Sequence, residues 1–127
     1  MKYLLDTHAM IWFFENDKQL PEKIRSVISD GNNIIYASIA SIWEIAIKIG
    51  LGKLELTLTT DMIFEQIEKD DFILLAITNE PINIIQTLPH HHRDPFDRMI
   101  IAQAQAENCT IISRDGAFED YDVPVLW

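Results

Sequence analysis

Short apolar segments alternate with longer segments of helical character along this chain, and no other feature constrains the fold as strongly. The strands we expect are 3–5, 34–36, 72–77 and 110–112, with 123–126 as a candidate fifth strand. The helices we expect are 7–15, 21–31, 38–49, 60–70, 80–88 and 94–108. This order favours an α/β fold in which helices cover both faces of a mainly parallel sheet of four or five strands. Ligands of such sheets usually bind beyond the carboxyl ends of the strands.

Length and composition predict a single domain over residues 1–127. Hydrophobic residues make up 48% of the chain, and no linker rich in Gly, Ser or Pro divides it. The single cysteine, Cys109, excludes an internal disulfide framework and a zinc site built from several cysteines, so we expect a cytoplasmic protein. The apolar runs are far shorter than the ~20 residues of a membrane span. Asp6 interrupts the first of these runs, which argues against a signal peptide.

Acidic residues follow two of the expected strands. Asp6 comes directly after the first strand, where it either caps the next helix or faces a site at the edge of the sheet. Thr7 is a second candidate for the cap of that helix. Asp115 follows the strand 110–112 and precedes Gly116, and an Asp-Gly pair is also common in turns. Position alone leaves these alternatives open for both acids.

A narrow polar stripe interrupts the otherwise apolar helix 38–49. It consists of Ser41, Glu44 and Lys48, which share one side of the helix. One interpretation is an ion pair between Glu44 and Lys48 that faces water, worth a few tenths of a kcal/mol at this spacing. The other is that the stripe faces a polar pocket.

The helix 94–108 begins with two acids that differ in their surroundings. Asp94 fits the N-cap position, with Pro95 in the first helical turn. Asp97 instead falls on the same arc as Phe96, Ile100 and other apolar residues, opposite Arg98. A carboxylate on a buried face needs a partner, because unpaired burial of a charge is costly. A metal ion is one such partner.

The histidines and tryptophans are interpreted more simply. His90, His91 and His92 are adjacent and point in different directions, so they are read as loop residues rather than a metal cluster, with His92 or Arg93 near a substrate. The three tryptophans, which are Trp12, Trp43 and Trp127, are read as packing residues rather than base-stacking platforms.

Together, the acids suggest one joint role. Four carboxylates in one pocket repel one another and cannot all ionise without cations. Hard oxygen ligands select Mg²⁺ or Mn²⁺, and such a site activates water and neutralises charge on a phosphate. The spacing of the acids permits them to converge but does not show that they do.

Four segments of the chain resemble the acidic motifs of PIN-domain ribonucleases, and most of all those of the VapC-type toxins of bacterial toxin–antitoxin pairs. The two specific motifs are Leu-Leu-Asp-Thr-His-Ala-Met-Ile-Trp at 4–12 and His-His-Arg-Asp-Pro-Phe-Asp-Arg-Met-Ile-Ile-Ala-Gln-Ala at 91–104. Ser-Ile-Trp-Glu-Ile at 41–45 and Ile-Ser-Arg-Asp at 112–115 match the other two, which are weaker alone. The resemblance covers essentially the whole chain, with the motifs in the family's order.

The resemblance implies a three-layer α/β/α fold and an endoribonuclease. It carries the family's acidic, metal-binding and catalytic positions onto Asp6, Glu44, Asp97 and Asp115. It implies that Mg²⁺ or Mn²⁺ activates a water that hydrolyses RNA phosphodiester bonds, leaving a 5′-phosphate and a 3′-hydroxyl. It also implies a homodimer and a cognate antitoxin. Thr7 and Ser113 are expected to support the ligands through hydrogen bonds.

The net charge of −10 argues against a protein that binds nucleic acid through bulk charge. Its distribution weakens that argument, because the segments around the four acids hold six acidic and five basic residues. These segments are 2–10, 40–48, 93–101 and 111–119. The basic residues within them that we expect to contact phosphate groups are Lys48, Arg93, Arg98 and Arg114.

A non-enzymatic signalling module, such as a phospho-accepting receiver domain, is the main alternative. Chain length and fold class allow it. A receiver domain normally has a pair of acids after its first strand and a lysine near its last. Here Asp6 is followed by Thr7 and His8, and no lysine occurs after Lys69.

Overall fold

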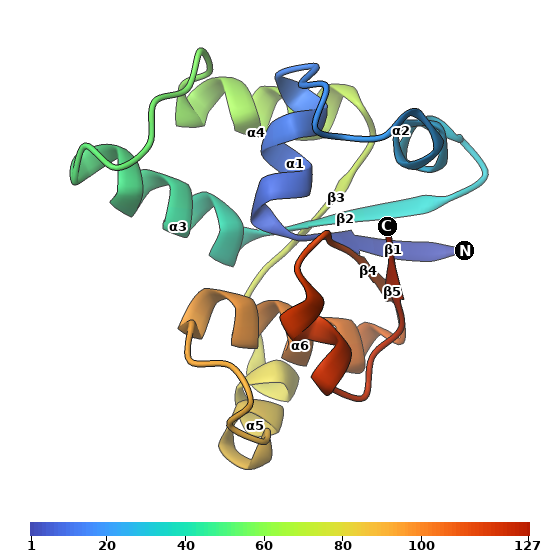
Figure 1. Ribbon diagram of the computed structural model, residues 1–127, viewed down its shortest axis with the longest axis vertical. Coiled ribbons are helices and arrows are strands. Elements are labelled where there is room, and N and C mark those ends of the chain that lie inside the picture. Colours follow the sequence, from blue (N-terminus) through green and yellow to red (C-terminus); the bar gives the residue numbers. More distant parts are fainter.

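A parallel sheet of five strands lies at the centre of the molecule (Figure 1). The computed structural model describes all residues from Met1 to Trp127. The strands are β1 (Lys2–Leu5), β2 (Ile34–Ser38), β3 (Ile73–Leu75), β4 (Thr110–Ile112) and β5 (Val125–Leu126). Their order in the sheet is β3-β2-β1-β4-β5, and every neighbouring pair is parallel. The predicted fold class is therefore confirmed.

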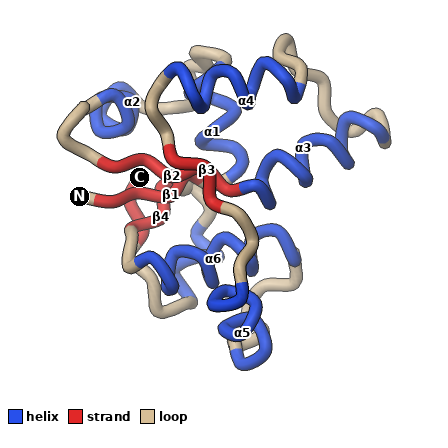
Figure 2. The backbone as a smooth tube through the Cα atoms, turned by 180° about the vertical axis from the view of Figure 1, so that it is seen from behind, coloured by secondary structure: helices blue, strands red, loops and turns tan.

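Helices form a layer on each face of the sheet. They are α1 (Thr7–Phe14), α2 (Glu22–Ser29), α3 (Ile39–Gly50), α4 (Thr60–Lys69), α5 (Asn79–Thr87) and α6 (Pro95–Glu107), together with the short 3₁₀ helix η1 (Gly116–Asp120). Helices α1 to α4 lie on one side of the sheet, and α5 and α6 lie on the other (Figure 2). None of these helices is both long and apolar enough to cross a membrane.

Each interface between the sheet and a helical layer is a separate hydrophobic core. The larger core joins strand residues such as Leu5 to α1, α2, α3 and α4 through side chains that include Met10 and Ile45. The smaller core joins β1 and β4 to α6 and η1 through side chains that include Ile101 and Phe118. Strands β1 and β4 contribute to both cores, which explains why they read as continuous apolar runs in the sequence.

Helices α1 and α4 begin at the predicted residues, Thr7 and Thr60, and in each the capping residue is the one before. The side chain of Asp6, not Thr7, caps α1 by accepting a hydrogen bond from the Ala9 amide. Thr59 caps α4 by accepting a hydrogen bond from the Met62 amide. In each case the earlier residue has the extended backbone that a capping residue requires.

The parallel topology brings the carboxyl ends of the three central strands to one edge of the sheet. Strand β1 lies between β2 and β4, with Leu5 opposite both Ala37 and Ile112. The residues that follow β1 and β4 are therefore neighbours, and the Asp6 amide donates a hydrogen bond to the carbonyl of Ile112 at 3.1 Å. This edge is where parallel α/β proteins bind ligands.

Candidate active site

Asp6 both caps α1 and faces this edge of the sheet, so the two alternatives left open by its position are not exclusive. One carboxylate oxygen accepts the Ala9 amide at 2.8 Å, and the other accepts the hydroxyl of Ser113 at 2.5 Å. The same Ser113 hydroxyl accepts the amide of Asp115 at 2.9 Å. Ser113 therefore links the acid after β1 to the acid after β4. Burial raises the pKa of the Asp6 carboxyl, and the hydrogen bonds from Ser113 and Ala9 oppose that rise.

Glu44 is buried, with 3% of its surface exposed, so the polar stripe on α3 faces the protein interior rather than water. One of its oxygens accepts the hydroxyl of Thr7 at 2.8 Å, and the other accepts Nζ of Lys48 at 2.5 Å. That hydrogen bond raises the pKa of the Lys48 ammonium. The ion pair expected at this spacing therefore exists, but it forms beside Thr7, the residue next to Asp6.

Asp97 projects from the first turn of α6. The prediction that Asp94 caps this helix is confirmed, because its side chain accepts the amides of Phe96 and Asp97. The carboxylate of Asp97 is thus free of capping, and its Oδ2 lies 2.8 Å from Nε2 of His92. Burial, followed by repulsion from Asp94 and Glu44, raises the pKa of Asp97 to about 7.

Asp115 caps η1 and lies at the open side of the site. One oxygen accepts the Ala117 amide at 2.9 Å, and the other lies 4.0 Å from Nε2 of His92. Half of its side chain is exposed. Ligand atoms of His92, Asp97 and Asp115 all lie within 4.8 Å of one another, close enough for one metal ion to contact all three.

The four predicted acids are electrostatic neighbours. Repulsion from Glu44 and Asp6 adds to the burial that raises the pKa of Asp97, and Asp115 acts on Asp6 in the same direction. Negative charge is therefore concentrated at this edge, where Lys48 forms an ion pair with Glu44 and His92 forms a hydrogen bond with Asp97. Carboxylate oxygens in excess of their cations fit a divalent metal ion such as Mg²⁺ or Mn²⁺.

We expect the metal-free protein to lose stability as the pH rises from about 4 to about 7. The carboxyl of Asp97 titrates near 3.8 in the unfolded chain and at about 7 in the folded protein. Between these two values the folded state binds a proton that the unfolded state has released. The contribution of this proton to the free energy of unfolding is complete below pH 3.8 and is lost as the pH rises through 7. Thermal unfolding in a chelator measures it. Asp97→Asn should flatten the decline, and an equally steep decline in that variant would contradict the assignment.

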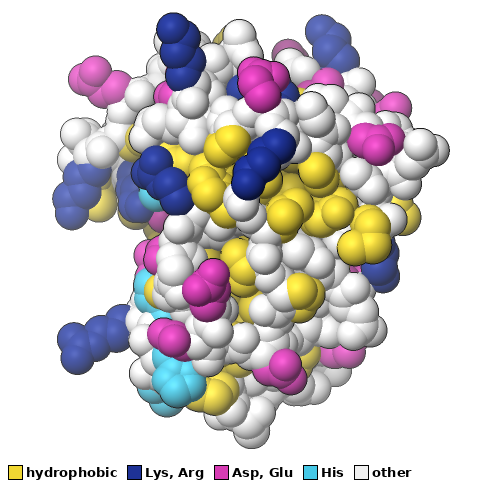
Figure 3. Space-filling model, turned by 45° about the vertical axis from the view of Figure 1, so that its right-hand side comes forward, with side chains coloured by type: hydrophobic (Ala, Val, Ile, Leu, Met, Phe, Trp, Pro, Cys, Tyr) yellow, Lys and Arg dark blue, Asp and Glu magenta, His cyan; other side chains and the backbone are white.

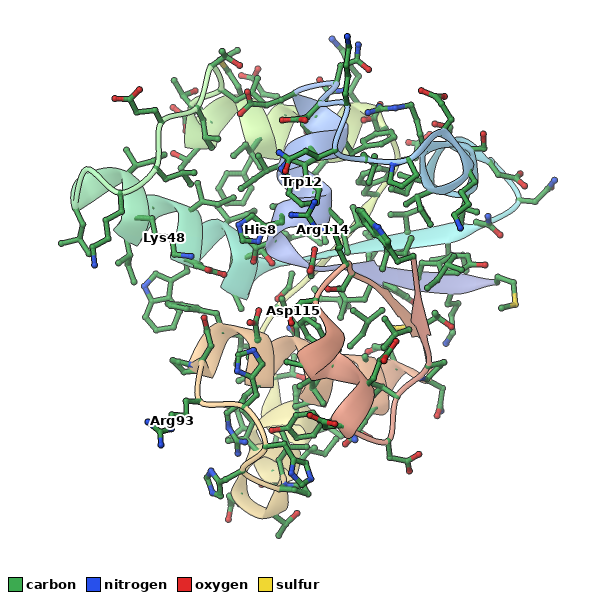
Figure 4. The ribbon with its side chains drawn as sticks, viewed as in Figure 1. His8, Trp12, Lys48, Arg93, Arg114 and Asp115 are labelled. Atoms are coloured by element: carbon green, nitrogen blue, oxygen red, sulfur yellow. The ribbon has the colours of Figure 1, made fainter.

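The four predicted phosphate contacts differ in where they lie. Arg114 is exposed beside the site, and Lys48 lies at the site because it is hydrogen-bonded to Glu44. Arg93 lies on the loop before α6 and points outward, away from the group formed by His8, Trp12 and Arg114 (Figure 4). On the face drawn in Figure 3, acidic and basic side chains are interspersed, with no continuous basic surface. Contacts to phosphate would therefore be local.

For Arg98 the structure contradicts the predicted phosphate contact. The residue is 7% exposed, and its guanidinium donates to the carbonyls of Leu88 and Pro89 at 3.2 and 2.7 Å. It also donates to the carbonyl of His92 and to the hydroxyl of Tyr121. The loop before α6 folds over the polar side of the helix and uses this side chain as its anchor. Arg98 is therefore a structural residue.

Sequence reasoning considered His92 near a substrate but missed its contact with Asp97 and the part that Tyr121 plays. His90, His91 and His92 do lie in a loop, but His92 turns back onto Asp97, five residues later. Tyr121 holds that turn, since its hydroxyl accepts the His92 amide and donates to the carbonyl of Pro89. Neither contact follows a helical or strand period. The only feature of the sequence that pointed to the contact with Asp97 was the position of His92, two residues before the cap of α6.

The tryptophans also differ from one another. Trp12 is buried and packs edge-on against Trp127, as a packing residue should. Trp43 is 58% exposed, although its ring meets Phe96 edge-on at 5.2 Å. Trp43 therefore packs against a neighbouring ring at the surface rather than in the core.

Comparison with protein families supports the resemblance seen in the motifs. The family model described as PIN domain matches residues 3–124, which includes all four acids. The chain belongs to the PIN domain family. PIN domains are nucleases, so membership supports a general hydrolase activity. None of the curated proteins compared with this PIN domain matches it.

Several solved structures, one of them from the VapBC family of toxin–antitoxin systems, share the fold of this PIN domain. VapBC2 from Rickettsia felis, bound to a DNA fragment from its promoter, has a TM-score of 0.74 at 15% identity, covering 99% of this chain and 98% of the other. FitAcB from Neisseria gonorrhoeae has a TM-score of 0.65 at 22% identity, covering 98% and 96%. VapBC-5 from Mycobacterium tuberculosis has a TM-score of 0.61 at 18% identity, covering 98% and 97%.

Proposed function

We propose that this PIN domain is a Mg²⁺- or Mn²⁺-dependent endoribonuclease and the toxin of a toxin–antitoxin pair. The observation that carries the proposal is the grouping of Asp97, Asp115 and His92 within 4.8 Å, next to the buried carboxylates of Asp6 and Glu44. Buried like charges at this spacing are stabilised by a cation. A divalent ion, when bound, lowers the pKa of water and neutralises charge that develops on a phosphate.

Each side chain has a distinct part in this proposal. The carboxylates of Asp6, Glu44, Asp97 and Asp115 hold the cation. Ser113 and Thr7 orient Asp6 and Glu44 through hydrogen bonds at 2.5 and 2.8 Å, so that these ligands need not reorganise on binding. The basic side chains of Lys48, Arg93 and Arg114 contact phosphate groups of the RNA.

We also infer that the protein forms a homodimer and is inhibited by an antitoxin. Complexes of the VapBC and FitAB type share its fold over nearly the whole chain. Helices α3 and α4 expose large apolar side chains of the kind that protein partners cover. These side chains are Trp43, Ile47, Ile49, Met62 and Phe64. Acidic surface outside the site suits a basic antitoxin segment.

Purified protein, freed of any antitoxin, should cleave single-stranded RNA in Mg²⁺ or Mn²⁺ and stop in EDTA. Cleavage by an activated water should leave products with a 5′-phosphate, which can be ligated directly, and a 3′-hydroxyl. Gel analysis of a labelled RNA measures both properties. Cleavage that persists in EDTA, or products that end in a 2′,3′-cyclic phosphate, would contradict the proposal. Stable phosphorylation of Asp6 by a small phosphodonor would instead favour the receiver alternative.

A further inference from the structure

A polar cavity of about 520 Å³ opens beside the acidic site. Asp6 and Asp115 form one end of it, and the remaining lining residues are His8, Trp12, Gln19 and Arg114. Its volume falls within the range of about 300–1,000 Å³ that is typical of ligand pockets. Five of the six lining side chains are polar or charged, which fits a polar ligand. The cavity is therefore continuous with the acidic site, with which it shares Asp6 and Asp115.

Arg114 is the only cationic arginine or lysine side chain in this cavity, and it is not neutralised. Its guanidinium carbon lies 4.6 Å from the centre of the Trp12 ring, within the distance of a cation–π contact. It forms no ion pair with Asp6 or Asp115, although both line the same cavity. The N–H groups along the edge of a stacked guanidinium remain able to bind an oxyanion.

The fold explains why Arg114 takes this position. Trp12 lies on α1, one turn after His8, and the two rings are 5.6 Å apart. Arg114 follows Ser113 at the carboxyl end of β4, next to β1, from which α1 starts. The ring of Trp12 is itself fixed by its edge-on contact with Trp127. Figure 4 shows His8, Trp12 and Arg114 grouped above Asp115.

We propose that this cavity holds the phosphate of the nucleotide next to the scissile bond, and that Arg114, positioned by Trp12, binds it. The inference rests on the proposed function, since it concerns the RNA strand that the acidic site would cleave. The carboxylates of Asp6 and Asp115 repel a phosphate, so a fixed guanidinium at the cavity wall supplies the attraction on the side away from the cation. Trp12 is a positioning residue, because it acts through Arg114.

Binding of a fluorescein-labelled single-stranded RNA, in Ca²⁺ and over a range of salt concentrations, tests the proposal. Arg114→Gln should weaken binding roughly fivefold to tenfold, and should reduce the slope of log K against log salt by about 0.7, the value for one phosphate of a single strand. The matched control is Lys23→Gln, which removes one charge from an exposed position on α2. It should change the affinity less than about twofold.

Trp12 variants test the positioning role separately. Trp12→Leu retains the charge of Arg114, so the salt slope should stay near that of the wild type while affinity falls about threefold to fivefold. Trp12→Phe keeps an aromatic face and should restore most of the affinity. Far-ultraviolet circular dichroism reports whether each variant is folded, and Trp12→Met, which also lacks an aromatic face, replaces Trp12→Leu if that variant is not folded.

The outcomes separate this inference from the proposed function. If the wild type cleaves RNA but Arg114→Gln has the salt slope of Lys23→Gln, the cavity inference is wrong and the nuclease proposal stands. If a labelled single-stranded DNA shows the slope change with Arg114→Gln while RNA is not cleaved, the phosphate site stands and the ribonuclease proposal is wrong. Equal effects of Trp12→Phe and Trp12→Leu, both folded, would overturn the positioning role.

Discussion

Asp97→Asn is expected to lower the rate of RNA cleavage by at least about a thousandfold, or about 4 kcal/mol of transition-state stabilisation. Its carboxylate lies 2.8 Å from His92, is repelled by Glu44 and Asp6, and belongs to the group whose ligand atoms lie within 4.8 Å. An amide is a much weaker ligand for a divalent cation and carries no charge. The measurement is the single-turnover rate on a labelled RNA in saturating Mn²⁺.

The matched control for this prediction is Asp94→Asn, which makes the same chemical change three residues earlier. Asn is as good an N-cap as Asp, so α6 should remain intact and activity should stay within about fivefold of the wild type. Unfolding does not explain a loss of activity in Asp97→Asn, because removing a partly buried charge should stabilise the metal-free protein. Comparable losses in both variants would show that negative charge at the start of α6, rather than ligation by Asp97, is what matters.

Arg98→Met is expected to reduce the free energy of unfolding by about 3 kcal/mol. The substitution keeps an unbranched apolar stem but removes every donor of the guanidinium. Four acceptors then lose a partner, namely the carbonyls of Leu88, Pro89 and His92 and the hydroxyl of Tyr121. The carbonyls of Leu88 and His92 are then left without a partner and carry a desolvation cost, whereas Pro89 and Tyr121 keep their hydrogen bond to each other. Urea unfolding monitored by circular dichroism measures the change.

Two further variants locate the origin of this effect. Arg93→Met removes the same group from an exposed position on the neighbouring loop and should change the free energy of unfolding by less than about 0.5 kcal/mol. Tyr121→Phe removes one hydroxyl from the same network and should cost about 1–2 kcal/mol. If Arg98→Met were as stable as the wild type but bound RNA more weakly than the wild type, Arg98 would be a phosphate contact after all.

Asp97 and Arg98 show that the tertiary structure preserves some local sequence patterns and overrides others. The helical wheel separated Asp94 from Asp97 correctly, because capping and burial both depend on residues within one turn of α6. The helical wheel placed Arg98 on the polar side of α6 and so predicted exposure, but residues 88–92 cover that side of the helix. Periodicity describes one helix and carries no information about which loop will pack on it.

For Glu44, the helical spacing predicted the interaction but not whether it would be buried. Its spacing from Lys48 correctly indicated an ion pair. Whether that pair faced water or a pocket depended on Thr7, which lies 37 positions earlier in the chain. A stripe of polar residues on one helix is compatible with both arrangements until its neighbour is known.

The alternation of strands and helices was enough to determine the fold class, because a parallel connection requires a crossover and short apolar strands require cover on both faces. The four acidic motifs were enough to indicate the PIN domain family. Only the tertiary structure decided the strand order β3-β2-β1-β4-β5, which makes the ends of β1 and β4 adjacent and lets Ser113 link Asp6 to Asp115. It also decided that His92 meets Asp97 and that Arg114 stacks on Trp12. These contacts join segments that are separated in sequence by a loop or by most of the chain, and such contacts arise from the packing of whole elements rather than from any local preference.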